Sequence, residues 1–392
     1  MNNKFLFTLC FIFCSIMVQA NDPIKVLIVT GQNSAHNWAA SYPILQNYLN
    51  ESGLFSADVA ISPKRGEDMS GFAPNFSAYQ AVVLDYEGDS WSDATKTAFL
   101  DYVKKGGGVV VYHSANNSFP KWKEYNEIIG LGGWGGRNEK DGPYVYFKDG
   151  KEVRDKSPGH GGSHGDAHEF TIDVRNAEHP ITNGLPASWW HAKDELYDRL
   201  RGPALNMNVL ATAYSDKSNG GTGRDEPVLM TINWGKGRIF HTVLGHVGDN
   251  ELLPQSMISS SFVVTFLRGT EWAATGKVTQ KVPADFPKTD KMSMFENTAA
   301  SVTGVSVLIV VSKSYDQTIT VFSDGTIQAI NKQFDSDSKD ASSFTDLGKF
   351  YDLIAIINAV KEIDKLYQGK CYMVRKLLID KSCVQLFHKP CP

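Results

Sequence analysis

Cysteine is missing from most of this 392-residue chain. Two of the five cysteines lie in the apolar start of the chain, and the other three are Cys371, Cys383 and Cys391, all within the last twenty-two residues. Residues 21–370 therefore contain no thiolate nucleophile. In an oxidising compartment the three C-terminal cysteines predict one disulfide and one remaining thiol, and the sequence leaves their pairing open.

Long runs of positive charge are also missing. The formal net charge is -4 at pH 7, so we do not expect nucleic acid as a partner. Hydrophobic residues make up 42% of the chain and charged residues 21%, which is typical of a globular protein. The length allows about two domains, each with its own core. No motif indicates a nucleotide cofactor.

Only the start of the chain is continuously apolar. Lys4 supplies a positive charge, residues 5–18 are almost all apolar, and Val18-Gln19-Ala20 offers a small-residue cleavage site. This pattern predicts a signal peptide over residues 1–20. The residues before Cys14 do not form a lipobox, which favours a soluble exported protein over a lipoprotein. No later stretch approaches the roughly 20 apolar residues of a membrane span. We therefore expect a periplasmic or secreted protein without a membrane span after signal removal.

Strands and helices alternate through residues 24–275. A helix is expected to begin near Pro43 and end at Gly53, and Ser92 is expected to cap the next one. A final helix is expected around residues 256–267. Strands that alternate with helices of about a dozen residues predict βαβ units and an α/β fold with a doubly wound, mostly parallel sheet. The expected strands cover residues 25–30, 55–62, 81–86, 108–113, 169–174, 209–213, 228–232 and 238–244.

The periodic pattern is lost between Trp122 and His168. This segment contains two glycine-rich stretches, residues 132–137 and 159–168, with tryptophan and histidine among the glycines. Its length favours a functional loop, and its aromatic content argues against disorder. We predict a structureless binding insertion whose ligand contacts are Trp134, Arg137, His164 and His168.

A separate C-terminal unit is predicted. Residues 276–302 have little pattern and are interpreted as a linker, and residues 303–392 as a small α+β domain. This domain is expected to contain a strand at 305–311, hairpins at 318–330 and 373–387, and a helix at 345–366. It is either an interaction unit with a protein partner or a stabilising appendage.

Polar residues follow four of the expected strands: His36, Glu87, His113 and His246. Loops after strands of a doubly wound sheet converge on one crevice, so we expect these side chains to lie together. His36, His113 and His246 with a carboxylate fit a divalent metal such as zinc. The same histidines also fit general acid/base catalysis, and both alternatives stay open because no His-Glu-x-x-His motif is present.

Two adjacent carboxylates, Asp194 and Glu195, follow an aromatic stretch. Adjacent residues on a strand point to opposite faces, so at most one of the two faces the crevice. We expect that residue to be Glu195, acting as a catalytic group. Asp194 is retained as a predicted ligand contact. Tryptophan rings are common platforms for sugars, and the glycine-rich surroundings of Trp134 offer it no core, which favours a ligand contact for that residue.

Four segments together carry a resemblance to a known family. In chain order they are Gly106–Ser114 (GGGVVVYHS), His179–Pro186 (HPITNGLP), Asp194–Tyr197 (DELY) and Trp234–His246 (WGKGRIFHTVLGH). With this order and spacing, residues 25–272 resemble the ThuA-like (trehalose-utilisation) family. The segment 161–170 is also similar to exported members.

The resemblance implies a flavodoxin-like fold, similar to class I glutamine amidotransferase domains, and a role with disaccharides or keto-sugars. Those amidotransferases carry a nucleophilic cysteine after the central strand, where this chain has His113 and Ser114, so thiolate glutaminase chemistry is excluded. Ser114 is a candidate replacement nucleophile, although no Gly-x-Ser-x-Gly motif surrounds it, and it is also kept as a substrate contact. We expect a hydrolase, lyase or isomerase with His113, His246 and Glu195 as catalytic groups. The alternative is a non-catalytic carbohydrate-binding protein.

Overall fold

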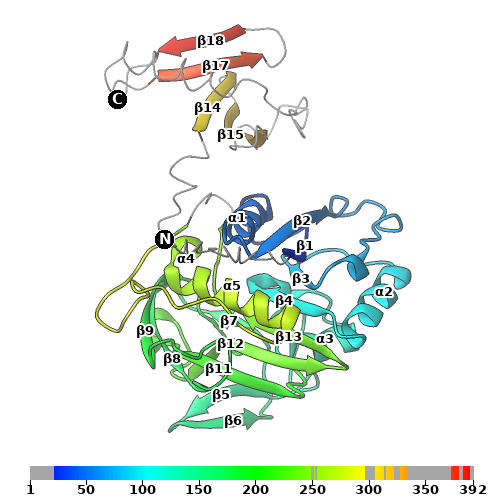
Figure 1. The fold of residues 1–392 in the computed structure, drawn as a ribbon, viewed down its shortest axis with the longest axis vertical. Helices are drawn as coiled ribbons and strands as arrows, with labels where there is room; N and C mark the ends of the chain where they lie inside the picture. The colour runs from blue at the N-terminus through cyan, green and yellow to red at the C-terminus, as the bar shows by residue number, and fades with distance from the viewer. Residues whose placement is uncertain are drawn as a thin grey trace, which may run out of the picture.

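The computed structural model describes residues 22–248, 251 and 254–295, and the backbone of five strands between Val305 and His388. Residues 22–295 form a large mixed sheet with helices on both faces (Figure 1). Among the residues described, no helix has the length and apolar character needed to cross a membrane. The sheet has a parallel half and an antiparallel half.

The parallel half confirms the predicted α/β fold. Its strands pair in the order β2-β1-β3-β4-β13, and every neighbouring pair in this half is parallel. The same order, 2-1-3-4-5, defines flavodoxin-like sheets. The bounds are β1 Ile24–Thr30, β2 Phe55–Ile61, β3 Ala81–Leu84, β4 Gly108–Tyr112 and β13 Gly237–Thr242.

The antiparallel half continues from β13 through β12, β11, β8 and β9. Only Gly235 and Lys236 separate Trp234 from its partner Gly237, and a two-residue loop permits an antiparallel pair only. The later strands therefore add hairpins to the sheet instead of further βαβ units. Their bounds are β8 His168–Val174, β9 Ser188–Asp194, β11 Met207–Tyr214 and β12 Asp225–Trp234.

Helices cover both faces of the parallel half. Helices α1 (Trp38–Glu51), α4 (Gln255–Ile258) and α5 (Ser260–Thr275) pack together, and Tyr48 donates a hydrogen bond from its hydroxyl to the Met257 carbonyl. Helices α2 (Asp93–Lys104) and α3 (Lys123–Ile129) cover the opposite face. Ser92 caps α2 as predicted, whereas Pro43 lies inside α1, which begins five residues earlier than expected.

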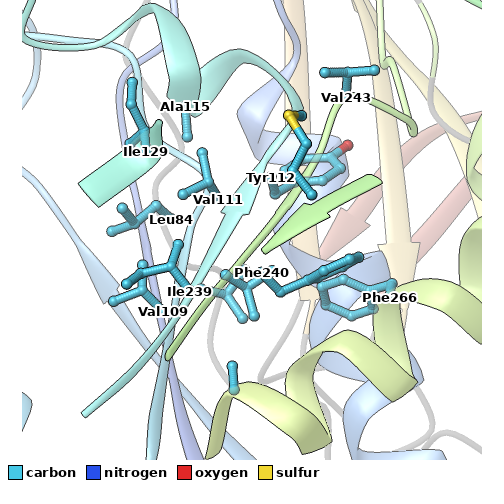
Figure 2. Close-up of a cluster of buried hydrophobic side chains, with 14 of the residues drawn as sticks. Leu84, Val109, Val111, Tyr112, Ala115, Ile129, Ile239, Phe240, Val243 and Phe266 are labelled. Atoms are coloured by element: carbon cyan, nitrogen blue, oxygen red, sulfur yellow. The ribbon is translucent and has the colours of Figure 1, made fainter. Parts of the chain in front are cut away.

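Alternating side chains of β4 and β13 fill the two cores that these helices close (Figure 2). Val111 and Ile239 point toward Ile129 of α3, whereas Tyr112 and Phe240 point toward Phe266 of α5. All these side chains are at most 2% exposed. A strand that is buried on both faces has a continuous run of apolar residues. The apolar run of β4 therefore predicted its central position in the sheet.

The prediction of a structureless insertion between Trp122 and His168 is wrong. The segment contains α3, the hairpin β5 (Tyr144–Lys148) and β6 (Lys151–Asp155), and the short β7 (Ser163–His164). The hairpin turn is Asp149-Gly150, with φ of 51° and 74°. An Asp-Gly pair with positive φ at both residues is a strong hairpin signal, and it was missed among the polar residues of this stretch.

The first part of the predicted linker packs against the domain. Phe286 is buried, and the backbone N–H groups of Trp190 and Ser260 donate to the carbonyls of Lys288 and Ser293. Residues 276–295 are therefore held along the surface of residues 22–275. The remainder of the predicted linker, residues 296–302, lies outside the described residues.

Five strands lie beyond residue 303 and pair in the order β16-β15-β14-β17-β18. They include the predicted first strand and both predicted hairpins. The predicted helix at 345–366 and the predicted disulfide lie outside the described residues. The bounds are β14 Val305–Ser312, β15 Tyr315–Val321, β16 Ile327–Gln333, β17 Tyr372–Leu378 and β18 Cys383–His388.

Candidate functional site

Four predicted side chains come together beyond the carboxyl ends of the parallel strands. His36, His113, His246 and Glu195 each offer a ligand atom, and these atoms all lie within 4.8 Å of one another. The three histidines follow β1, β4 and β13, and Glu195 follows β9 at the far edge of the sheet order. Both halves of the sheet therefore contribute to one cluster of four side chains, which we call the histidine–glutamate cluster.

His113 occupies the sharp turn after the central strand. Its φ is +43°, a left-handed value that costs a residue other than glycine about 1–3 kcal/mol. Its Nδ1 lies 2.5 Å from the Val243 carbonyl, so Nδ1 carries the proton and Nε2 carries a lone pair. This Nε2 is buried and has no hydrogen-bond partner. Burial, followed by the neighbouring His36 and His246, holds the pKa of His113 well below its usual range.

His36 is fixed in the same tautomer by a different contact. Its Nδ1 lies 3.0 Å from Oδ1 of Asn33, whose amide donates to the Ser114 hydroxyl at 2.6 Å. The Nε2 atom of His36 thus accepts from the Tyr197 hydroxyl at 3.0 Å. Burial, with smaller contributions from His246 and His164, lowers the pKa of His36 to about 3. The imidazole is neutral at physiological pH.

Glu195 faces the cluster as predicted. Its Oε1 lies 3.3 Å from Nε2 of His246, and its Oε2 lies 3.9 Å from Nε2 of His164. Burial raises the pKa of the Glu195 carboxyl, and the nearby histidines oppose that shift. The cluster therefore combines the neutral imidazoles of His36 and His113 with a carboxyl group that gains a proton more readily than an exposed glutamate.

Asp194 was predicted to contact a ligand, but its side chain contacts the protein instead. Its side chain is fully buried and accepts hydrogen bonds from the backbone N–H groups of Gly245 and His246 at 2.7 and 3.0 Å. It also contacts Nε2 of His191 at 2.9 Å. Asp194 therefore holds the loop that carries His246 against the end of β9.

A cavity of about 400 Å³ opens over the cluster. Trp134 forms one wall, with its ring 4.8 Å from the Tyr197 ring. The backbone N–H of Trp134 donates to the Gly161 carbonyl, and a Cβ on Gly162 would lie 2.5 Å from the backbone nitrogen of Trp134. The glycine-rich stretches thus pack on each other and hold Trp134 in place. Other lining residues include Asn33, His36, Glu87, Asn117, His164, Glu195 and His246.

Three other predicted contacts, Arg137, Ser114 and His168, do not line this cavity, and their side chains contact the protein itself. Arg137 is buried and binds the carbonyls of Asn117, Gly133 and Ser118, so it braces the loop. Ser114 is buried against Asn33, as described above. His168 lies at the start of β8, where its Nδ1 contacts the Asp166 carbonyl. Glu87 does line the cavity, but its carboxylate accepts from Ser34 at 2.6 Å.

Sequence reasoning missed Tyr197 and Asn33, which contact the cluster directly. Tyr197 is buried, and its ring lies 4.3 Å from the ring of His113. Tyr197 belongs to the DELY segment quoted above, which was a signal that could have found it. Asn33 lies in the polar loop after β1, and nothing in the pattern distinguishes it from its neighbours.

The fold and cluster define an α/β protein with a histidine-rich cavity at the carboxyl ends of its parallel strands. The profile of the ThuA family, described as trehalose utilisation, matches residues 25–273. The chain belongs to the ThuA family, which confirms the resemblance read from the sequence.

The solved structures that are similar to this chain include two ThuA-like proteins. A ThuA-like protein from Parabacteroides merdae is 56% identical, with a TM-score of 0.67, and the match covers 70% of this chain and 98% of that one. A ThuA-like protein from Bacteroides uniformis is 18% identical, with a TM-score of 0.40, and the match covers 66% and 95%. No curated protein matches the chain.

Proposed function

We propose that this ThuA family member is an exported enzyme that acts on a disaccharide or keto-sugar as a hydrolase, lyase or isomerase. The observation that carries the proposal is the histidine–glutamate cluster at the base of a cavity walled by Trp134. Membership of a family described as trehalose utilisation supports a sugar substrate. The predicted signal peptide supports export, to the periplasm or the medium.

The cluster contains an imidazole and a carboxyl group whose pKa values are shifted in opposite directions. Burial lowers the pKa of His36 to about 3, so its imidazole is neutral and weakly basic, and its Nε2 accepts from the Tyr197 hydroxyl. Burial raises the pKa of Glu195, so this carboxyl is better suited to donate a proton. Titratable groups whose environments push their pKa values apart are the usual arrangement of a general acid and a general base.

The contacts around the cluster assign positioning roles. Asn33 orients His36, and Asp194 orients the loop of His246. Trp134 offers a ring face for the apolar side of a sugar. The Tyr197 hydroxyl, 3.0 Å from His36, lies where it can bind a sugar hydroxyl.

The test is turnover of a panel of disaccharides, trehalose included, and of their keto derivatives by the chain from Asn21 onward, followed by mass spectrometry. Glu195→Gln keeps the shape of the side chain but removes its ionisable proton. We expect kcat/KM to fall by about 10²–10⁴. Glu51→Gln, an exposed change at the end of α1, is the matched control and should leave the rate unchanged.

The alternative is a carbohydrate-binding protein without turnover. In that case sugars of the panel would bind, with affinity reduced by Trp134→Ala, and no product would form with any of them. Product formation that is equal in the wild type and Glu195→Gln would contradict the assignment of Glu195.

A further inference from the structure

We propose that His36, His113, His246 and Glu195 bind one divalent transition-metal ion. The catalytic role of this ion rests on the proposed function, whereas its binding does not. Four donor atoms within 4.8 Å of one another leave room for a single central ion. Three imidazole nitrogens and one carboxylate oxygen are a donor set that suits zinc and neighbouring first-row metals.

The unpartnered Nε2 of His113 is an independent observation for a ligand. The side chain is 1% exposed, and its Nδ1 proton is committed to the Val243 carbonyl. Its Nε2 lone pair therefore faces the cluster without a hydrogen-bond donor. Buried polar atoms are nearly always satisfied, and an unsatisfied one is explained by strain, by a catalytic role, or by an absent water or ion. Unlike the other unpartnered buried atoms of the described residues, Nε2 of His113 belongs to a group of four metal-ligating side chains, and a metal ion there would be its partner.

The hydrogen bonds that hold the histidines resemble those found around the ligands of metal sites. Metal-binding histidines usually donate their second N–H to a carbonyl or carboxylate, which fixes the ring and the tautomer. His113 donates to the Val243 carbonyl, and His36 donates to Oδ1 of Asn33. His246 is held through its backbone by Asp194. These contacts leave Nε2 of His113 free for a ligand, whereas Nε2 of His36 contacts the Tyr197 hydroxyl.

A cluster of aromatic rings that merely pack together is the competing explanation. The rings of His36, His113 and His246 have centroids 4.9–5.4 Å apart and interplanar angles of 63–82°. Ring packing accounts for these contacts, but it does not account for a buried lone pair directed at other nitrogens. In this structure the Tyr197 hydroxyl takes the Nε2 of His36, so metal binding through that atom releases the hydroxyl.

The experiment measures metal binding by the chain from Asn21 onward after treatment with a chelator. Zinc, cobalt and manganese are added separately, and bound metal is determined by elemental mass spectrometry after gel filtration. Cobalt(II) bound by nitrogen and oxygen ligands also gives a visible absorption spectrum that reports its coordination. We expect one ion per chain for zinc or cobalt.

The variants are His113→Ala and His36→Ala, with His168→Ala as the matched control outside the cavity. Each cluster variant should weaken zinc binding by at least about tenfold, since even outer contacts of metal sites are worth about 10–100-fold. Circular dichroism verifies that each variant is folded. If His113→Ala does not fold, the more exposed His36→Ala serves alone.

Two results would overturn the metal site: no stoichiometric binding of any of the three metals, or equal affinities in the wild type and both cluster variants. The outcomes also separate this inference from the proposed enzyme. Bound metal without sugar turnover would leave the metal site standing and count against the enzyme. Sugar turnover by metal-free protein would support acid/base catalysis and count against a catalytic role of the ion, while the binding measurements would still decide the metal site.

Discussion

The two halves of the sheet contribute to the site in different ways. The parallel half supplies His36, His113 and His246 directly from the ends of its strands. The antiparallel half supplies Glu195 and Tyr197, together with Asp194, which ties the His246 loop to β9. The first contribution follows from the parallel topology, whereas the second depends on how the antiparallel strands pair one after another to the edge strand β9.

The first prediction concerns the stability of the protein when Asp194, which joins the two halves of the sheet, is replaced. Asp194→Ala removes a buried carboxylate that accepts hydrogen bonds from Gly245 and His246 and contacts His191. We expect a loss of about 3–5 kcal/mol in the free energy of unfolding, because buried N–H groups and a histidine lose their partner. Urea denaturation measures it.

The control for this junction is Asp101→Ala on α2, where the side chain is 60% exposed and its partner Lys105 lies 4.0 Å away. Its effect should stay within about 0.5 kcal/mol. A loss at Asp194 no larger than the control would show that the two halves are not joined there.

The second prediction concerns a buried acid of the parallel half. Burial raises the pKa of Asp85 to about 7, while Ser41 and Thr30 hydrogen-bond to its carboxyl. The folded state therefore holds a proton that the unfolded chain has released. The stability that this proton provides is complete below the unfolded pKa of about 4 and is lost as the pH rises through 7.

Over that window the slope approaches about 1.4 kcal/mol per pH unit. Asp85→Asn removes the ionisation, so its unfolding free energy should change less than that of the wild type between pH 5 and pH 7. Parallel urea titrations at both pH values measure this difference. Identical pH dependence in the two proteins would show that Asp85 is already ionised in the folded state.

The third prediction affects the parallel half without touching the site. A Cβ on Gly269 of α5 would overlap the ring of Phe240, so Gly269→Ala forces the helix away from β13. We expect a loss of about 1–3 kcal/mol. Gly71→Ala, where a Cβ meets nothing within 4 Å, is the control. Thermal unfolding of both variants measures the difference, and equal melting temperatures would contradict the close packing of α5.

The smallest effect is expected at the start of α2. The Ser92 hydroxyl accepts from the backbone N–H of Thr95, and loss of such a cap costs about 1 kcal/mol. Ser92→Ala should lower the melting temperature by a few degrees. Ser90→Ala, two residues earlier and exposed, should leave it unchanged. If both variants lowered the melting temperature equally, the loss of the Ser92 cap would not account for the effect.

The sequence located the parallel half because its signals are local. The apolar run of β4 ends at His113, and polar residues after strands of such a sheet must share one edge. Because neighbours on a strand alternate, only one of Asp194 and Glu195 was expected to face the cluster, and the pattern itself did not select Glu195. The strand-end rule predicted the three histidines of the histidine–glutamate cluster, and the choice of Glu195 supplied the fourth member.

The antiparallel half could not be located in the same way. Whether Asp194 meets a ligand or the His246 backbone depends on where β9 lies, which is set by pairing across several hairpins. Arg137 is charged and lies among glycines, so the sequence suggested a ligand contact, but its partners are carbonyl groups of residues up to 20 positions away. Such contacts between distant residues leave no periodic trace in the sequence.

The central claim is that both halves supply ligands to one centre. A crystal structure of the chain grown with zinc, with an anomalous difference map at the zinc edge, tests it most directly. The account predicts one strong peak bonded to His36, His113, His246 and Glu195. A map without a peak between these side chains, or with zinc bound only elsewhere, would contradict it.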